Sequence, residues 1–416
     1  MKEQRKVQQI RFKGFTNDWE QRKLSDFGIA TGGTSIESEF SSNGKYKVIS
    51  IGSYSENSNY NDQGIRAIHS DKTKTRVLNK EDLTMILNDK TASGRIIGRV
   101  LYIDKSGEYV YNQRTERIEI NRELYNPKFI YHLLNAPEMR NKIIKQSQGN
   151  TQIFVNWNGI KNTEYLIPHL NEQARLEKIF ANIDNLITLH QRKCDKLVEV
   201  KNSLLEKMFP KNSSKIPEIR FKGFTDDWEQ RKLKDISSYR RGSFPQPYGK
   251  EEWYGGSQAM PFVQVADVND DLKLNEETKQ TISKLAQPMS VYIPKESVIV
   301  TLQGTIGKVA ITQYNTYLDR TILYFDTYKI GNINKYFWAL TIKNKFEEER
   351  KKAPGAVIKT ITKEVLSEFN LNIPQHDEQE KIGMLFANID NLITLHQRKL
   401  EKLKEVKKSM LEKMFV

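Results

Sequence analysis

The sequence has almost no cysteine and no long apolar run. A single cysteine, Cys194, excludes a disulfide bond within the chain and is typical of a reducing compartment, so we expect a cytoplasmic location. No stretch approaches the roughly 18 uncharged apolar residues of a membrane-spanning helix. The first residues, MKEQRKVQQIRFKGF, lack the apolar core of a signal peptide. We therefore expect neither membrane insertion nor secretion.

Common catalytic motifs are missing as well. There is no GxxxxGK[ST] phosphate loop, no HExxH zinc motif, no CxxC pair and no GxGxxG dinucleotide motif. Asn126-Pro127-Lys128-Phe129 is similar to the NPPF-like motif of adenine methyltransferases. It lacks the second proline and opens a helical pattern, so a helix start is the better interpretation. We expect a non-catalytic chain without a metal site or a cofactor of its own.

Positive charge is what the sequence has in excess. The net charge is +14 and the isoelectric point is about 9.4. Such a balance is typical of proteins that bind a polyanion, most often nucleic acid. General lysine richness is the alternative that charge alone leaves open.

Two segments of the chain occur twice. FANIDNLITLHQRK at 180–193 recurs unchanged at 386–399, and IRFKGFTNDWEQRKLSD at 10–26 recurs with two substitutions at 219–235. The segments between these blocks differ strongly. The period far exceeds the 20–50 residues of repeat arrays, so the pattern indicates a tandem duplication with shared frames and different inserts.

Residues 173–209 have the spacing of a long helix. Apolar residues recur every four and three positions over about five heptads, which defines an a/d seam. A helix of about 37 residues would be about 55 Å long and would leave this seam in water if it were alone. The second copy repeats the seam, so we expect the two helices to pair antiparallel as a coiled-coil spacer. The seam residues are Phe180, Ile183, Ile187, Leu197 and Leu204, and Phe386, Ile389, Ile393, Leu403 and Met410.

Two kinds of polar residue belong to this helical pattern. Lys201 and Lys407 occupy equivalent seam positions, where a polar residue costs stability and can fix the register. Asp184 falls on the outer face, which is most simply a solvated face and alternatively a docking face for a partner. Cys194 lies in the seam, where a packing role is expected.

The two inserts have mixed patterns. Short strands are predicted for GKYKVISIGSY, LTMILND and VLYID in the first insert, and for MPFVQVADV, SVYIPKESVIVTLQ and GKVAITQY in the second. Each insert then has one helical stretch, NPKFIYHLLNAPEMRNKIIKQ or NINKYFWALTIKNKFEEERKK. The predicted fold class is α+β, given twice.

Glycine-containing loops of the inserts are the candidate DNA-binding elements. SGRIIGRV at 93–100 and QGTIGKVA at 303–310 place basic residues among glycines, which let a backbone approach a ligand. Arg and Lys can reach phosphates or the edge of guanine, although an ordinary surface turn is the alternative for each residue. Arg114-Thr115 and Arg320-Thr321 form an apparent internal repeat. The predicted DNA-binding residues are Arg95, Arg99, Arg114, Gln152, Arg240, Arg241, Gln303, Thr305, Lys308, Arg320 and Lys359.

The order of these parts closely resembles the specificity subunit of type I restriction-modification enzymes. Each variable insert leads into IPxxxEQ and a long helix, each RFKGFTxDWEQRKLxD block stands ahead of an insert, and the resemblance covers essentially the whole chain. It implies two target recognition domains held apart by two antiparallel helices in a pseudo-twofold arrangement. Each domain would read one half of a bipartite, asymmetric site in double-stranded DNA, and the helices would set the unread spacer.

The resemblance also implies partners and boundaries. Two methyltransferase (modification) subunits and restriction/translocation subunits would supply S-adenosylmethionine, ATP, Mg and the methylation, ATP hydrolysis and cleavage. The predicted segments are an N-terminal frame segment (1–26), target recognition domain 1 (27–166), a central long helix (167–209), a linker with the second frame segment (210–235), target recognition domain 2 (236–372) and a C-terminal long helix (373–416).

Two other classes of function stay open at this point. A self-sufficient modification and cleavage enzyme would transfer methyl groups as a purified chain. A coiled-coil scaffold with incidental charge would bind DNA without sequence preference.

Overall fold

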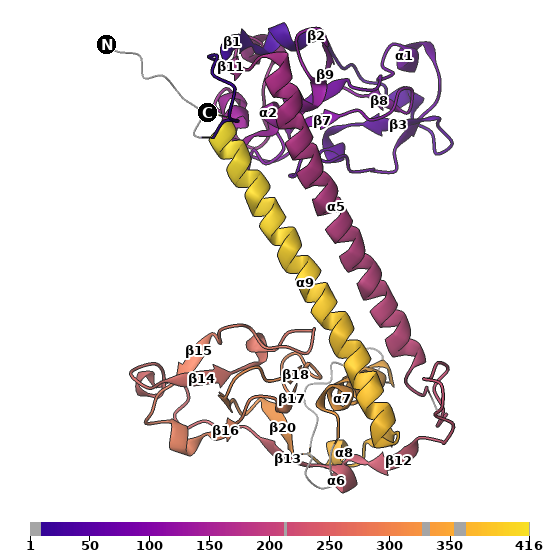
Figure 1. Ribbon diagram of the computed structural model, residues 1–416, viewed down its shortest axis with the longest axis vertical. Coiled ribbons are helices and arrows are strands. Elements are labelled where there is room, and N and C mark those ends of the chain that lie inside the picture. The colour runs from indigo at the N-terminus through magenta and orange to yellow at the C-terminus, as the bar shows by residue number, and fades with distance from the viewer. Residues whose placement is uncertain (1–9, 212–213, 327–332, 353–362, 416) are drawn as a thin grey trace. The chain divides into compact units, whose positions relative to one another are not determined.

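The computed structural model describes residues 10–211, 214–326, 333–352 and 363–415, and these form two compact units (Figure 1). Unit 1 comprises the chain up to Gln191 together with Arg398 onward, and unit 2 comprises Arg192–Gln397. The two long helices, α5 (Leu170–Lys207) and α9 (His376–Met414), each contribute one part to either unit.

Unit 1 is built on a four-stranded antiparallel sheet of order β2-β9-β5-β7 and a three-stranded sheet of order β4-β3-β8. Its strands are β1 (Glu20–Lys23), β2 (Gly28–Gly32), β3 (Tyr46–Ile49), β4 (Arg66–Ala67), β5 (Leu83–Ile86), β6 (Asn88–Asp89), β7 (Val100–Tyr102), β8 (Tyr109–Tyr111), β9 (Thr115–Ile120), β10 (Ile153–Phe154) and β11 (Glu164–Ile167). Its shorter helices are α1 (Asp71–Lys74), α2 (Pro127–Asn135), α3 (Pro137–Ile144) and α4 (Trp157–Ile160).

Unit 2 repeats this plan with sheets of order β13-β20-β17-β18 and β15-β14-β19-β16. Its strands are β12 (Glu229–Lys232), β13 (Ser238–Arg241), β14 (Met260–Val263), β15 (Gln280–Ile282), β16 (Val291–Ile293), β17 (Val298–Thr301), β18 (Val309–Ile311), β19 (Thr316–Leu318), β20 (Ile322–Asp326) and β21 (Asn370–Ile373). Its shorter helices are α6 (Leu233–Ile236), α7 (Lys335–Lys352) and α8 (Lys363–Ser367). The predicted α+β class, given twice, is confirmed.

The repeated frame blocks make the same contacts in each unit. β1 pairs antiparallel with β11 in unit 1, and β12 pairs with β21 in the same register in unit 2. Arg11 holds the buried carboxylate of Glu172 through two nitrogens at 2.9 and 2.8 Å. Arg220 holds Glu378 in the same way at 2.7 and 2.8 Å. Such two-point pairs fix geometry as well as charge, so each frame block is anchored to the start of its long helix.

The long helices run antiparallel where they pack within each unit. In unit 1 the ring of Phe180 stacks on Phe415 with centroids 5.8 Å apart, and Asp184, one turn further along α5, binds Lys407. In unit 2 the equivalent rings of Phe386 and Phe209 also pack together, tilted and with centroids 6.3 Å apart. The predicted antiparallel pairing is therefore confirmed, and the seam residues of α5 and α9 are buried or half-buried in it.

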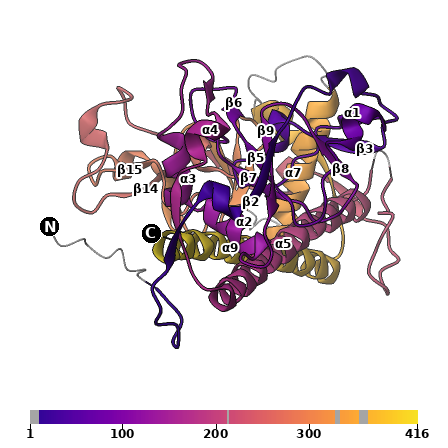
Figure 2. The same ribbon diagram turned by 90° about the horizontal axis from the view of Figure 1, so that it is seen from above.

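Each core lies between the four-stranded sheet and the helices. In unit 1, α2 lies beside α5 in both views (Figures 1 and 2), and Phe129 of α2 contacts Phe415, the residue after α9. In unit 2, Phe337 of α7 stacks on Phe209. The end of one long helix thus closes the core of each unit, next to Trp19 in unit 1 and its counterpart in unit 2.

Asp184 has a different environment from the one predicted. Asp184 was expected on a solvated outer face, but its Oδ1 accepts a hydrogen bond from Lys407 Nζ at 2.6 Å. The equivalent Asp390 binds Lys201. Heptad spacing alone could not show this, because long Lys side chains reach from the seam to carboxylates that flank it.

Candidate nucleic-acid interface

The glycine loops of the inserts are held closely against their own helices. Gly98 has φ +71°, and a Cβ there would lie 2.9 Å from Ile143 Cγ2 of α3. Gly307 has φ +82°, and a Cβ there would lie 2.9 Å from Phe346 Cβ of α7. Positive φ and close packing both require glycine at these positions. Approach of the backbone to a ligand is not needed to explain them.

An arginine on the covering helix fixes each of these loops. In unit 1 the Arg140 guanidinium donates to the carbonyl oxygens of Gly94, Arg95 and Ile97 at 2.9, 3.1 and 3.2 Å. In unit 2 Arg350 donates to the carbonyl of Ile306 at 2.9 Å. The loop backbones are therefore rigid supports for the side chains that they carry.

The predicted residues Arg99 and Lys308 occupy equivalent positions and act as internal braces. Arg99 donates to Ser58 Oγ at 3.1 Å, and its burial beside Arg140 lowers its pKa to about 10. Lys308 Nζ donates to the carbonyl of Val268 at 3.2 Å and lies 3.3 Å from a carboxylate oxygen of Asp270. Both side chains are half-buried and tie the loop to the same turn of their unit.

The predicted residues on the same loops are less constrained. Arg95 is exposed, and its ion pair with Glu56 joins two exposed side chains, which makes it weak. Thr305 is exposed and Gln303 half-buried. Arg95 is thus the basic residue of loop 93–100 that is best placed to meet a phosphate.

Unit 2 brings two predicted arginines together at one turn. Arg241 Nε donates to the carbonyl of Arg320 at 3.1 Å, and the Arg320 guanidinium lies 5.4 Å from the centre of the Tyr248 ring. The Tyr248 hydroxyl donates to Asp319 at 3.1 Å and accepts from Gln264 at 2.9 Å. Burial and Asp319 raise the pKa of Tyr248 to about 12, so its hydroxyl stays protonated. The result is an exposed cluster of forked donors held by aromatic and acidic groups.

The equivalent turn of unit 1 carries different chemistry. Asn112 and Asp319 correspond, because their amides donate to Ile49 and Val263 at the same position of the parallel strand pair, both at 3.0 Å. The residue after each is Gln113 in unit 1 and Arg320 in unit 2. The apparent repeat of Arg114-Thr115 and Arg320-Thr321 is therefore wrong by one residue.

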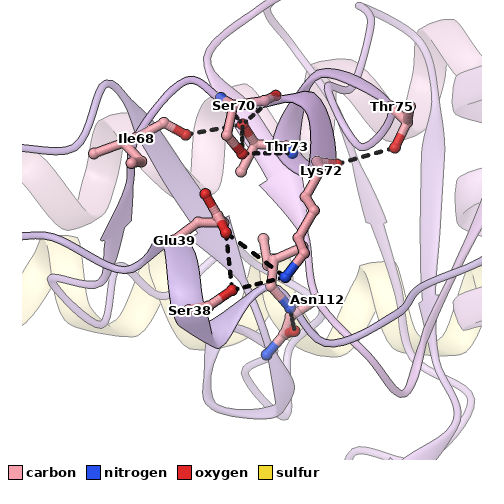
Figure 3. Close-up of polar contacts among 9 residues, drawn as sticks. Ser38, Glu39, Ile68, Ser70, Lys72, Thr73, Thr75 and Asn112 are labelled. Atoms are coloured by element: carbon pink, nitrogen blue, oxygen red, sulfur yellow. Dashed lines mark hydrogen bonds and ion pairs between the residues drawn. The ribbon is translucent and has the colours of Figure 1, made fainter.

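Unit 1 holds its turn with a polar network of its own (Figure 3). Gln113 donates to Glu37 at 3.2 Å, and the Asn112 side chain accepts from the amide of Ile36 at 3.1 Å. Nearby, Figure 3 shows Glu39 contacting Ser38 and Lys72. The Ser70 hydroxyl, then Ser38 and Lys72, hold the pKa of Glu39 below its usual value. The segment around Glu37–Glu39 is thereby pinned beside Gln113.

The remaining predicted residues belong to neither of these clusters. Arg114 is exposed with φ +67°, and Gln152 and Arg240 are exposed. Lys359 lies outside the described residues. The structure therefore joins Arg95 with Arg99 on one loop and Arg241 with Arg320 at one turn.

Several side chains at these turns are not among the residues predicted from the sequence. Gln113, Tyr248 and Gln264 lie at the two equivalent turns but belong to no motif. The only signal that could have found them is strand register, which places them after β8, after β13 and after β14. Glu116 was also missed: it is buried in β9, and burial raises its pKa to about 7.

Neither a membrane-spanning helix nor a cluster of metal-ligating side chains occurs in the part of the chain that the structure describes. No helix in these ranges is long and apolar enough to cross a bilayer. Within the same ranges, no three His, Cys, Asp or Glu side chains gather in a way that could hold a metal ion.

Comparison with known proteins identifies the family. The model of the type I restriction modification DNA specificity domain matches twice, at residues 16–199 and 225–405. The chain therefore belongs to the family of type I restriction-modification specificity subunits, as the sequence resemblance predicted.

Individual relatives agree with this assignment. The MjaVIII specificity subunit of Methanocaldococcus jannaschii is 23% identical over 362 residues, which cover 81% of this chain and 79% of the relative. The crystal structure of the S subunit from M. genitalium superposes with a TM-score of 0.65 at 13% identity, covering 99% of both chains. A chain from a study of complex assembly in the type I restriction-modification system gives 0.54 at 15% identity, covering 96% and 98%. These structural likenesses establish the fold.

Proposed function

We propose that this chain selects the DNA target of a type I restriction-modification complex, with each unit reading one half of a bipartite, asymmetric site. One observation carries the proposal: the repeated blocks of the two units are nearly identical, whereas the turns that follow β8 and β19 differ. Arg320 and Gln113 stand at equivalent positions of the two units. An arginine fork suits guanine and a glutamine suits adenine, so two unlike half-sites are expected.

The repeated helices supply surfaces for two equivalent partners. Leu186 and Leu189 of α5 are 44% and 46% exposed, and Leu392 and Leu395 of α9 are 45% and 46% exposed. Exposed leucines that recur at matching positions of a repeat suit the docking of two copies of one partner. We assign this role to two methyltransferase subunits, with the helices setting the length of the unread spacer.

We infer that the chemistry belongs to other subunits. The modification and restriction/translocation subunits would hold S-adenosylmethionine, ATP and Mg, and the complex would act in the cytoplasm. This chain would contribute binding and positioning alone, through basic and polar residues of the two units.

The experiment that tests the proposal is methylome mapping. The chain is co-expressed with its modification partner in a host without adenine methylation, and N6-methyladenine is located by long-read sequencing. A two-part motif with a fixed gap is expected. A continuous motif would mean that one unit alone reads DNA, and no motif from an intact complex would favour the scaffold alternative.

A substitution makes the same experiment residue-specific. Arg320→Gln should change one half of the motif and leave the other half and the gap as they were. Lys284→Gln removes the same charge at an exposed position of unit 2, so it is the matched control and should leave the whole motif unchanged. A motif unaltered by Arg320→Gln would remove this turn from the reading surface.

A further inference from the structure

Unit 1 contains a groove that the DNA-reading role does not use. Its volume is about 370 Å³, and it lies between α2, the β7–β8 region and the first half of α5. Four tyrosine rings line it, together with His132, Asp184 and Asn185; the tyrosines are Tyr60, Tyr102, Tyr109 and Tyr131. This is the size of pocket that holds a small molecule.

A buried histidine without a hydrogen bond faces this groove. The His132 side chain is 5% exposed, and its Nε2 lies 4.0 Å from Asp184 Oδ2, beyond hydrogen-bond distance. Among residues 10–211 and the other described ranges, no group donates to or accepts from the His132 ring. Burial, with Lys407 and Lys128 nearby, lowers its pKa to about 3, so the ring is neutral and one nitrogen can accept a hydrogen bond. The other Asp184 oxygen already binds Lys407.

In the corresponding region of unit 2, two side chains of that unit bind the long helix α9. Tyr336 donates to Asp390, the equivalent of Asp184, and Lys273 Nζ crosses from the 268–274 turn to Thr394 at 2.8 Å. In unit 1 the residue that corresponds to Lys273 is Asn59, at the same position of the matching turn, and it is too short to reach the helix. Unit 2 thus carries an alkylammonium at the edge of a region that stays open in unit 1.

The chemistry of the groove favours a cation. Asp104 and Asp184 line it and balance the ammonium groups of Lys128 and Lys407, and the electron-rich faces of the four tyrosine rings attract a further ammonium group. Lys128 already lies 5.6 Å from the centre of the Tyr102 ring at the edge. A DNA phosphate would meet carboxylates here, so the groove is unsuited to the target DNA.

We propose that this groove binds a linear alkyl diamine or polyamine through one primary ammonium group. The nitrogen lies between His132 Nε2 and Asp184 Oδ2 and donates to both, since acceptors 4.0 Å apart can share one donor nitrogen at ordinary hydrogen-bond lengths of about 2.9 Å. The alkyl chain runs along the tyrosine rings. The amine enters as the ammonium ion and no bond is made or broken.

The test is a calorimetric titration of the full-length chain, alone and in complex with its modification subunits, without DNA. The probe is 1,5-diaminopentane, and 1,5-pentanediol is the neutral control. Saturable binding of one diamine per chain is expected, with no binding of the diol. Asn59→Lys should weaken diamine binding at least tenfold, because it supplies the ammonium that Lys273 supplies in unit 2. Asn57→Lys adds the same charge at an exposed neighbouring position and should leave binding unchanged.

A second variant distinguishes a loss of diamine binding from a loss of folding. His132→Leu places the residue type of its unit 2 counterpart, Leu340, in the groove and should also abolish diamine binding while the chain stays folded. Absence of saturable binding to the chain alone, or equal binding by the wild type and Asn59→Lys, would overturn the proposal. The diamine could also bind the chain alone but not the complex. That result would overturn the small-ligand proposal and indicate that a lysine of the partner subunit occupies the groove.

Discussion

At the scale of single residues, two lysines in the helix seam form ion pairs with carboxylates of the opposite long helix. Lys201 lies 2.6 Å from Asp390 Oδ1 in unit 2, and their side chains are 13% and 7% exposed. The matching pair in unit 1, Lys407 and Asp184, is 22% and 36% exposed. Because a buried charge that loses its partner is costly, the two pairs should respond differently to the same substitution.

Asp390→Asn should lower the free energy of unfolding of unit 2 by about 3 kcal/mol, since Lys201 would stay buried without a counter-charge. Asp184→Asn, the matched control in the more exposed pair, should cost about 1 kcal/mol or less. Urea unfolding followed by hydrogen exchange separates the two units. The triple variant Lys201→Met/Tyr336→Phe/Asp390→Leu also removes the hydroxyl that donates to Asp390, and it should recover most of the loss. Equal losses in Asp390→Asn and Asp184→Asn would contradict the burial argument.

His132 makes unit 1 sensitive to mild acid. The pKa of His132 is about 3 in the folded chain and 6.5 in the unfolded chain. Between these pH values the unfolded chain therefore binds one proton more than the folded chain. The stabilisation is complete above pH 6.5 and is lost toward pH 3, by about 1.4 kcal/mol for each pH unit. Comparing wild type with His132→Leu between pH 7.5 and 5 keeps Asp184, Lys128 and Lys407 constant. The wild type should lose about 2 kcal/mol more, and parallel curves would show that folding does not lower the pKa of His132.

At the scale of elements, predictability followed the length of the pattern. The long helices are predictable because their apolar seam is sustained over about five heptads. The first and last residues of this pattern lie close to the observed ends of α5 and α9. Asn126 was correctly predicted as a helix start, because its side chain caps α2 by accepting from the amide of Phe129. The stretch after it breaks into α2 and α3 at Pro137, whereas its counterpart forms the single helix α7.

Short strands were the harder elements. β2 contains glycine at both ends, and β13 carries two adjacent arginines, so neither has the alternation that marks a strand. Their place is decided by pairing with β9 and β20, which lie far away in the sequence. The same long-range pairing fixes which turn residues correspond, which is why the candidate site was predicted only in part.

The helices also carry a prediction about spacing. Inserting seven residues, one heptad, after Gln191 and again after Gln397 keeps the seam in phase and adds about 10 Å to each helix. Under the proposed function the gap in the methylated motif should grow by about three base pairs, at 3.4 Å each, while both half-sites stay the same. Altered half-sites with an unchanged gap would exclude the helices as the spacer. Insertion into one helix alone is the control and should abolish assembly.

At the scale of the whole molecule, each unit is closed by a phenylalanine that lies just after the C-terminal end of a long helix. Phe415 enters the core of unit 1 and Phe209 enters that of unit 2, with 1% and 9% exposure. The duplication explains this arrangement: each copy of the long helix ends in the same residues, and each end packs on a Phe of the other long helix within one unit.

Phe415→Ala should therefore destabilise unit 1 by about 3–5 kcal/mol and leave hydrogen exchange in unit 2 unchanged. Phe209→Ala is the mirror-image control and should act on unit 2 alone. Loss of protection in both units after either substitution would mean that the two units unfold together.

The closure of unit 1 by residues 398–415 has a consequence for how the protein is made. Ribosomes extend the chain from its N-terminus, and domains usually fold as they emerge. Here the first unit to emerge lacks a wall of its core until all of unit 2 has been translated. Its apolar surface is then exposed while the second half of the chain is made, so nascent chains should bind chaperones. A ribosome that stalls within the second half should leave a product in which unit 1 lacks its closing helix and unit 2 is truncated.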